Sequence, residues 1–368
     1  MWRRSLAQSH YLNMMNNHFP ARLIARVLER SWRPVPEPLS ISAEEVHQVS
    51  PLLLATGTAA LAWRRIQSAD LPTTRPFADL EDAYHQHAIE AAFHEINTQD
   101  IFKRVHAARV EPIVFKGWGL ARLYPDAGLR PYGDIDLWVR PDHLQKLRDA
   151  LPAGSERAYC VDSHVSFYPQ YERSFEDVLR NSHLVSLNGV QVRLPSDEDH
   201  LRFICLHFLF HGGWRPLWLC DVALMVESAN SQFDWDRCLR GRHKHADWIA
   251  CTIGLAHQLL GAEISGTPVE KRARTLPRWL TTAVLRQWEQ GTGMSFADDL
   301  SFSFPRRLFK PAALARALRE HWRNPIQASV EMNASFDSSP RSMWQIGSAV
   351  SRLPAFAEQL VRDVLKAH

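Results

Sequence analysis

The sequence predicts an α+β fold, with a small mixed sheet in an α/β core at residues 105–195 and helical regions on both sides. Strand-like runs gather in this central part, where apolar and polar residues alternate. Before and after it, apolar residues recur at helical spacing between Gly- and Pro-containing turns. A chain of 368 residues is long enough for two or three modules. We therefore expect an N-terminal helical region at 1–104, the core, and a C-terminal helical domain at 196–368.

The composition is that of an ordinary soluble protein, with 45% hydrophobic residues. Lys and Arg number 43 against 40 for Asp and Glu, so nucleic acid is a possible but not an indicated partner. The five cysteines lack a Cys-x-x-Cys pair, which fits a reducing cytoplasm. The apolar run at 51–63 is shorter than the about 20 residues that span a bilayer. Because no apolar segment follows the basic start, we expect a cytoplasmic protein without a membrane partner.

The N-terminal region is predicted to be mostly helical. Residues 1–40 are expected to form a helix and then an extended, Pro-rich stretch. Ser42 and Glu45 stand at the spacing of a capping box, which opens a short helix ahead of a buried one at 51–67. A long amphipathic helix is predicted from residue 83 toward residue 108. Its apolar positions are Ile89, Ala92, Phe93, Ile96 and Ile101.

A glycine-containing turn follows the first predicted strand, at 111–115. The turn spans 116–119 and leads into a helix-like segment at 120–124. A turn from a strand into a helix N-terminus leaves free backbone N–H groups, which suit phosphate binding. Lys116 adds a positive charge beside them.

Two carboxylates, Asp134 and Asp136, stand two residues apart in an otherwise apolar run. In a strand, such residues point to one face, so the two side chains are expected to lie side by side. They would repel each other unless a cation lay between them, and hard divalent ions prefer oxygen ligands. The pattern predicts a Mg²⁺ site, although Asp-x-Asp also occurs on solvated strand edges without a metal.

The segment from Val114 to Val139 resembles the signature of an uncharacterised nucleotidyltransferase-like family in the DNA polymerase β nucleotidyltransferase superfamily. The matching residues are Lys116-Gly117, Leu120-Ala121, Leu123-Tyr124-Pro125-Asp126, Arg130-Pro131 and Gly133 to Val139. The resemblance implies a glycine turn that grips a triphosphate, two aspartates that bind Mg²⁺ or Mn²⁺, and a third carboxylate on a later strand.

The resemblance also implies a set of nucleotide-binding residues. They are Lys116, Gly117, Gly119, Arg130 and Gly133. Arg130 could equally be structural. Trp118 stands where the superfamily usually has a small polar residue, so the turn is expected to rely on backbone N–H groups and Lys116.

The third carboxylate is expected at Asp162. A strand predicted at 158–168 places Asp162 and His164 on one side. By the resemblance, Asp162 would bind the catalytic metal and accept the proton of the attacking hydroxyl. An exposed strand-edge aspartate is the alternative. His164 could act as an acid, a base or a substrate contact, or be a hydrogen-bonded structural histidine.

A hairpin and a helix follow the predicted strand. Asn188-Gly189 is a strong two-residue turn, and we expect the hairpin at 183–193 to extend the sheet. A capping motif at 196–199 opens a helix at 201–211.

That helix carries His207 and His211 four residues apart, on one face. With Asp221 they could form a transition-metal site of a helical metallohydrolase, but the glutamate of a zinc protease is missing. We favour a polar network that joins the helical domain to the nucleotide site. Arg215 could reach a substrate phosphate.

The rest of the chain is predicted to be helical. Helices are expected at 235–239, 246–260, 277–290, 311–322 and 354–365, with a Ser-rich loop at 328–341. The basic segment at 306–323 suggests a solvated helix face, with an acidic partner or a nucleic-acid backbone as the alternative.

The sequence therefore suggests transfer of a nucleoside monophosphate from an NTP such as ATP to an unidentified hydroxyl or phosphate acceptor, with release of pyrophosphate. Asp134 and Asp136 would hold the metal, and Asp162 would activate the acceptor. Two alternatives stay open: a nucleotide-binding scaffold protein without turnover, and the metallohydrolase.

Overall fold

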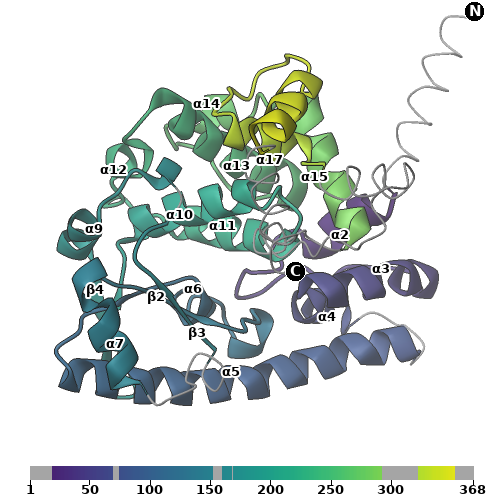
Figure 1. Cartoon of the computed structure of the whole chain (residues 1–368). Coiled ribbons are helices and arrows are strands. Elements are labelled where there is room, and N and C mark those ends of the chain that lie inside the picture. Colours follow the sequence, from purple (N-terminus) through teal and green to yellow (C-terminus); the bar gives the residue numbers. More distant parts are fainter. Residues whose placement is uncertain (1–18, 69–73, 152–159, 168, 292–321, 353–368) are drawn as a thin grey trace, which may run out of the picture.

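The computed structural model describes residues 19–68, 74–151, 160–167, 169–291 and 322–352. The predicted α+β class is confirmed: small sheets of three and two strands lie among many helices. The long helix α5 (Arg75–Ala107) runs along one edge of the molecule, and the helices of the C-terminal half lie on the far side of the three-stranded sheet (Figure 1).

The N-terminal helices are α2 (Phe19–Leu28), α3 (Ala43–Thr56) and α4 (Ala59–Ile66). The capping box is confirmed, because the Ser42 hydroxyl accepts from the Glu45 N–H at 3.2 Å and Glu45 accepts from the Ser42 N–H at 2.9 Å. The continuous helix predicted at 51–67 is wrong. Gly57 adopts φ 72° and donates its N–H to carbonyls of the last turn, which ends α3 before α4 begins.

Helix α5 has 33 residues and begins before the predicted start. One side of it is buried against the rest of the chain. Its buried residues are Leu80, Ala83, Ala91, Thr98, Ile101, Phe102 and Val105. The prediction that the positions 89, 93 and 96 share this packing face is wrong, because all three side chains are exposed.

The three-stranded sheet consists of β1 (Ile113–Phe115), β2 (Ile135–Trp138) and β3 (Val161–His164), in the order β1-β2-β3. Strand β2 pairs antiparallel with β1 and parallel with β3. The chain between β1 and β2 forms α6 (Gly117–Ala121) and the 3₁₀ turn η1 (Ala127–Leu129). After β2 come η2 (Pro141–His143) and α7 (Leu144–Ala150). The sequence-predicted strands are thus present but shorter.

Alternation along β2 sends its side chains into two different cores. Ile135, Leu137 and Val139 pack in a cluster with residues of α5. Trp138 joins the larger cluster, which includes residues of α10 (Asp197–Phe210). Asp136 shares the Trp138 side by the period of two, so its carboxylate points away from the α5 core.

The predicted hairpin is present as β4 (His183–Leu187) and β5 (Val190–Leu194), after η3 (Pro169–Tyr171) and α9 (Phe175–Asn181). Asn188 and Gly189 have φ 48° and 86°, as a type I′ turn requires. The expectation that the hairpin extends the sheet is wrong, since β4 and β5 form a separate sheet. Val192 and Leu194 instead attach it by packing in the α5 core.

The C-terminal half is built of helices around α10, which is buried along most of its length. Further helices described in this half are α11 (Pro216–Ser228), α12 (Trp235–Leu239), α13 (His243–Leu260), α14 (Glu270–Ala273), α15 (Arg278–Gln290) and α17 (Pro325–Glu331). Residues 342–352 are helical as well. The larger core contains residues of α2, α3 and α4 as well as of these helices. Within the described ranges, no helix combines the length and the apolar character needed to cross a membrane.

Two predictions for the C-terminal part need correction. The loop predicted at 328–341 begins as helix, because Asn324 caps α17 by accepting from the Gln327 N–H at 2.9 Å. Arg323 does not belong to a solvated face, since it is 3% exposed and its Nε lies 2.8 Å from Glu331. The remainder of the basic segment up to residue 321 and the helix predicted at 354–365 lie outside the described residues, as does the helix predicted at 311–322 except for Trp322, which is not helical.

Candidate active site

Asp136 is the buried centre of the candidate site, with 1% of its surface exposed. It lies in the middle strand, opposite Phe115 of β1 and Asp162 of β3. The parallel register of β2 and β3 therefore places two carboxylates next to each other on neighbouring strands.

Both oxygens of Asp136 contact a basic side chain. Oδ2 lies 3.0 Å from the Lys116 Nζ, and Oδ1 lies 3.1 Å from the His164 Nε2. The same His164 nitrogen is 3.3 Å from Oδ2 of Asp162. One imidazole therefore bridges the carboxylates of Asp136 and Asp162. Lys116 contacts the other oxygen of Asp136 and neutralises this buried carboxylate.

The pKa values of Asp134, Asp162 and His164 are shifted by their neighbours in the site. Burial lowers the pKa of His164, but the hydrogen bonds to Asp136 and Asp162 outweigh it and raise that pKa to about 9. The hydrogen bond from His164 lowers the pKa of Asp162. Desolvation raises the pKa of Asp134, and the charge of Asp136 raises it further, although Asp134 keeps access to solvent. The three aspartates are thus electrostatic neighbours.

Asp136, Asp162 and His164 form a set that can hold a divalent ion. Each offers one ligand atom, and these atoms lie within 4.8 Å of one another. Two carboxylate oxygens and a neutral imidazole nitrogen suit a divalent cation, so an ion bound here would displace the His164 proton. The two basic groups on Asp136 indicate that its buried charge requires a positive counterpart. Asp134, predicted as the first metal ligand, precedes β2 and is not in this set.

The glycine turn lies directly beside the carboxylates. Lys116, between β1 and α6, has φ 54° and ψ −143°, a conformation that is costly for a residue with a Cβ. Gly117 has φ 42°, and a Cβ there would lie 3.1 Å from the carbonyl oxygen of Asp134. The turn therefore needs glycine in order to approach the start of β2 so closely.

The other turn residues have different surroundings. A Cβ at Gly119 would lie 3.2 Å from Leu194 and 3.4 Å from His200, whereas one at Gly133 would meet nothing within 4 Å. Trp118 is buried in the α5 core. Its indole therefore serves packing, which accounts for tryptophan where a small polar residue was expected.

His200, on α10, supports the turn and was not predicted. Its Nε2 accepts a hydrogen bond of 3.3 Å from the backbone N–H of Lys116. Burial, helped by the charges of Arg122 and Arg130, lowers the pKa of His200 to about 3, so the ring is neutral and can accept. The capping motif at 196–199 places His200 in the first turn of α10, but no local pattern reveals a partner 84 positions away.

Arg130 and Asp221 form a buried pair that ties α11 to the turn. The Arg130 Nε and Nη2 lie 3.0 and 2.8 Å from the two Asp221 oxygens. Tyr124 donates to the same carboxylate at 2.9 Å, and Arg130 also donates to the Gly117 carbonyl at 3.5 Å. Arg130, expected either to contact the nucleotide or to be structural, is 3% exposed and supports the turn through the Gly117 carbonyl.

His207 and His211 lie next to each other, with ring centroids 4.4 Å apart, and both contact Trp218. Burial lowers the pKa of His211 to about 4 and holds that of His207 well below its usual value. Asp221 does not join them in a ligand set among the described residues, because Arg130 holds its oxygens. The structure therefore does not support the metallohydrolase alternative.

Arg215, which the sequence suggested could reach a substrate phosphate, lies against Thr56 and Trp218. Its Nε donates to the Thr56 carbonyl at 3.0 Å, and its guanidinium lies 5.7 Å from the Trp218 ring. Burial lowers the pKa of Arg215 to about 10. These contacts join α11 to the end of α3.

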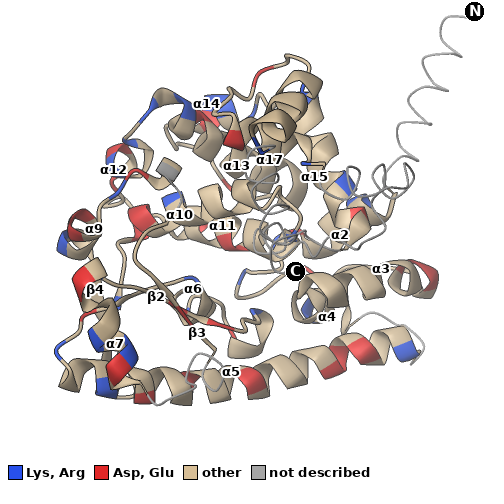
Figure 2. Ribbon diagram, viewed as in Figure 1, with Lys and Arg blue, Asp and Glu red and all other residues tan. Residues whose placement is uncertain are grey.

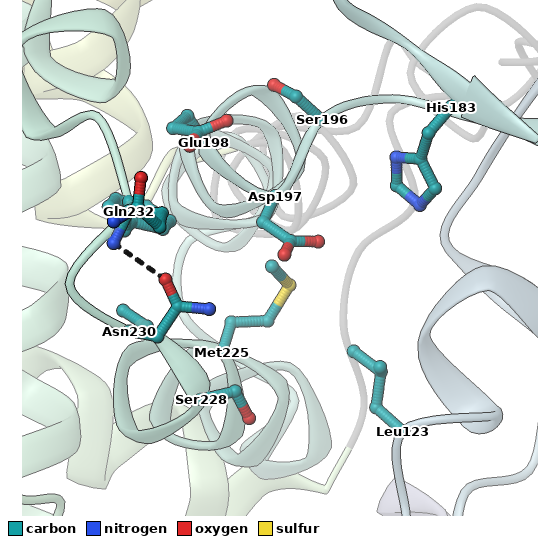
Figure 3. Close-up of a pocket in the computed structure, with 11 residues that line it drawn as sticks. Leu123, His183, Ser196, Asp197, Glu198, Met225, Ser228, Asn230 and Gln232 are labelled. Atoms are coloured by element: carbon teal, nitrogen blue, oxygen red, sulfur yellow. Dashed lines mark hydrogen bonds between the residues drawn. The ribbon is translucent and has the colours of Figure 1, made fainter.

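A separate cavity of about 270 Å³ lies between the start of α10 and the end of α11. Asp197, Met225 and Asn230 line it, and Asn230 accepts a hydrogen bond from the Gln232 N–H (Figure 3). Leu123 and His183 complete its lining from the other half, and the residues of the carboxylate site do not line it, so the cavity is separate from that site.

The mixed sheet, the glycine turn and the metal-capable carboxylates together define the class of nucleotidyltransferase-like α+β proteins. The model of a family described as "uncharacterised nucleotidyltransferase" matches residues 42–261, which is more than half of the chain, and the chain belongs to that family. Comparisons with curated proteins and with solved structures give no match. The family match confirms the resemblance predicted from residues 114–139.

Proposed function

We propose that this protein transfers a nucleoside monophosphate from an NTP such as ATP to a hydroxyl or phosphate acceptor and releases pyrophosphate. The observation that carries the proposal is the register of β2 and β3, which sets Asp136 beside Asp162 next to the Gly117 turn. Family membership supports the general reaction class.

Asp136, Asp162 and His164 are the residues that would hold Mg²⁺ or Mn²⁺, with Asp134 assigned to the same ion. Their ligand atoms fit a divalent cation, and Asp134 is close enough for its pKa to respond to Asp136. When bound, the metal would neutralise negative charge that develops on the phosphate oxygens.

Asp162 is the proposed base. Its side chain is 60% exposed, so an acceptor can reach it, and the lowered pKa keeps it ionised near neutral pH. Asp162 takes the proton of the acceptor hydroxyl while the oxygen bonds to the α-phosphorus. The bond from that phosphorus to the bridging oxygen breaks, and pyrophosphate leaves with the electron pair.

Lys116 and the glycines 117, 119 and 133 are proposed to contact the phosphates. Lys116 already lies against the carboxylate site, and open space surrounds the Cα of Gly133. Arg130 would act indirectly, by holding the Gly117 carbonyl and thus the position of the turn.

Label transfer from α-³²P-NTPs to a panel of sugar, nucleotide, peptide and RNA acceptors tests the proposal. We expect Asp136→Asn and Asp162→Asn to lower transfer by about 100-fold or more, the size of a lost proton acceptor or metal ligand. Asp142→Asn, on the exposed turn η2, is the matched control and should keep full activity.

The test also separates transfer from binding without turnover. Mg²⁺-dependent NTP binding that disappears in Asp136→Asn, with no labelled product from any acceptor, would favour the nucleotide-binding scaffold. Equal label transfer by wild type and Asp136→Asn would contradict the assigned site.

A further inference from the structure

Helix α5 exposes a stripe of large apolar side chains on the side that faces away from the molecule. Ile89, Phe93 and Ile96 are 60%, 63% and 61% exposed. Their spacing of four and three residues places them on one helical face. Contiguous apolar surface of this kind marks an interaction site more often than isolated exposed residues do.

We propose that this stripe is the contact surface of a homodimer, in which α5 of one protomer packs antiparallel on α5 of its partner. The stripe supplies the apolar centre of the contact. The charges at its two ends determine the partner and the direction.

Asp82 lies seven residues before Ile89, and Lys103 lies seven residues after Ile96. Seven residues are close to two helical turns, so both charges lie on the face of the stripe, one at each end. Both residues are exposed, and within the described chain neither takes part in an ion pair. Figure 2 shows acidic segments in the half of α5 that contains Asp82.

An antiparallel two-fold arrangement matches these positions. When Ile89 meets Ile96 of the partner subunit, Asp82 meets Lys103 of the partner subunit, and the same pair repeats on the other side of the axis. A parallel arrangement would instead oppose Asp82 to Asp82 and Lys103 to Lys103. The charges therefore select a second copy of this chain in the antiparallel direction.

Helix α5 is also suited to carry such a contact. Its 33 residues are about 50 Å long at a rise of about 1.5 Å per residue, and its opposite side is anchored by buried residues such as Leu80 and Phe102. The helix lies at the edge of the molecule, where a partner can approach it (Figure 1).

Another helical segment, at 342–352, exposes Met343, Ile346 and Val350. It carries no acidic residue, so it lacks the self-complementary charge pattern of α5. This segment supplies a control, because Ile346 is 54% exposed and is thus comparable in exposure to Phe93 at 63%.

Sedimentation velocity of the full chain over a concentration series tests the apolar part. We expect a dimer, and Phe93→Ser should raise its dissociation constant about 100-fold, as expected when two buried aromatic side chains are lost. Ile346→Ser should leave it unchanged. A monomer at all concentrations, or equal weakening by both variants, would overturn the proposal. The proposal would also be overturned if the protein were a monomer and Phe93→Ser lowered its free energy of unfolding, because the stripe would then pack within one chain.

Charge reversal tests the direction. Asp82→Lys and Lys103→Asp should each weaken the dimer about tenfold, since each opposes like charges twice. The double variant should return to wild-type affinity, because opposite charges face each other again. Additive weakening in the double variant would rule out the antiparallel pairing.

Discussion

At the residue scale, Asp136 determines the character of the site. It is an almost fully buried carboxylate with a lysine on one oxygen and a histidine on the other. Removing one partner of a buried charge pair leaves an uncompensated charge, which costs more than the pair itself contributes. The stability of the sheet should therefore depend on Lys116 when no metal is present.

We predict that Lys116→Met lowers the free energy of unfolding by about 1–3 kcal/mol, the range for a partly compensated buried charge. Urea unfolding in the presence of a chelator measures the loss, and added Mg²⁺ should recover more stability in the variant than in wild type. Lys146→Met, an exposed lysine of α7, should change little. An unchanged urea midpoint for Lys116→Met would mean that the pair contributes nothing.

Gly117 allows a second prediction at this scale. Gly117→Ala should destabilise the protein by about 1–2 kcal/mol, because its φ of 42° disfavours a side chain and the new Cβ would press on the Asp134 carbonyl. Gly133→Ala, with no atom within 4 Å of its Cβ, should keep the wild-type melting temperature. Equal melting temperatures for both variants would contradict this account.

The sequence predicted the site best where acidic residues stand within the two-residue alternation of a strand. The alternation around Asp136 and around Asp162 predicted the face of each side chain, and the register of β2 and β3 then brought them together. Sequence could not predict that Lys116 pairs with Asp136, or that His200 accepts from Lys116, because both contacts depend on how distant segments pack.

At the element scale, α10 is a buried core helix that carries neutral histidines. The pKa values of His200 and His211 are lowered to about 3 and about 4, chiefly by burial. Because these values lie below that of an unfolded histidine, protonation favours the unfolded chain. These histidines therefore leave the free energy of unfolding unchanged above pH about 6.5. They lower it as the pH falls toward about 4.

We predict that the urea midpoint falls between pH 7 and pH 5, and that His211→Gln makes this fall shallower. His85→Gln, at an exposed position of α5, should keep the wild-type slope. A midpoint that rises on acidification, or the same slope for His211→Gln, would contradict the sign of the effect.

Elements with strong local signals were predicted well. The bounds of α12 match the prediction, and the Asn188-Gly189 turn and the Ser42 cap are as expected. The failures arise where tertiary packing decides the outcome. The hairpin attaches through Val192 and Leu194 rather than through strand pairing, and the α5 stripe stays exposed although its period resembles a core face.

At the scale of the whole molecule, the described N-terminal and C-terminal helices share one core. Helices α2, α3 and α4 contribute to the same apolar cluster as α10 to α15 and α17. Glu227, at the end of α11, reinforces this contact by accepting from Arg33 at 3.0 and 2.7 Å and from the Trp32 indole at 3.0 Å. Burial raises the pKa of Glu227, but these hydrogen bonds outweigh it and lower the pKa overall.

We predict that Glu227→Ala destabilises the protein by about 2–3 kcal/mol, because it leaves several donors without their acceptor. Glu176→Ala removes an exposed ion pair with Arg140 and should cost at most about 1 kcal/mol. Thermal unfolding of both variants gives the comparison. A smaller loss for Glu227→Ala than for Glu176→Ala would show that apolar packing alone holds the N-terminal helices against α11.

The contacts of Arg130 and His200 matter for anyone who shortens this chain for expression. The glycine turn is supported by α10 and α11, through His200 to the Lys116 amide and through Asp221 to Arg130. A recombinant fragment cut at residue 195 would retain every proposed phosphate and metal ligand yet lack both supports. Truncation products should accordingly be insoluble or unable to retain nucleotide, even though the signature itself is intact.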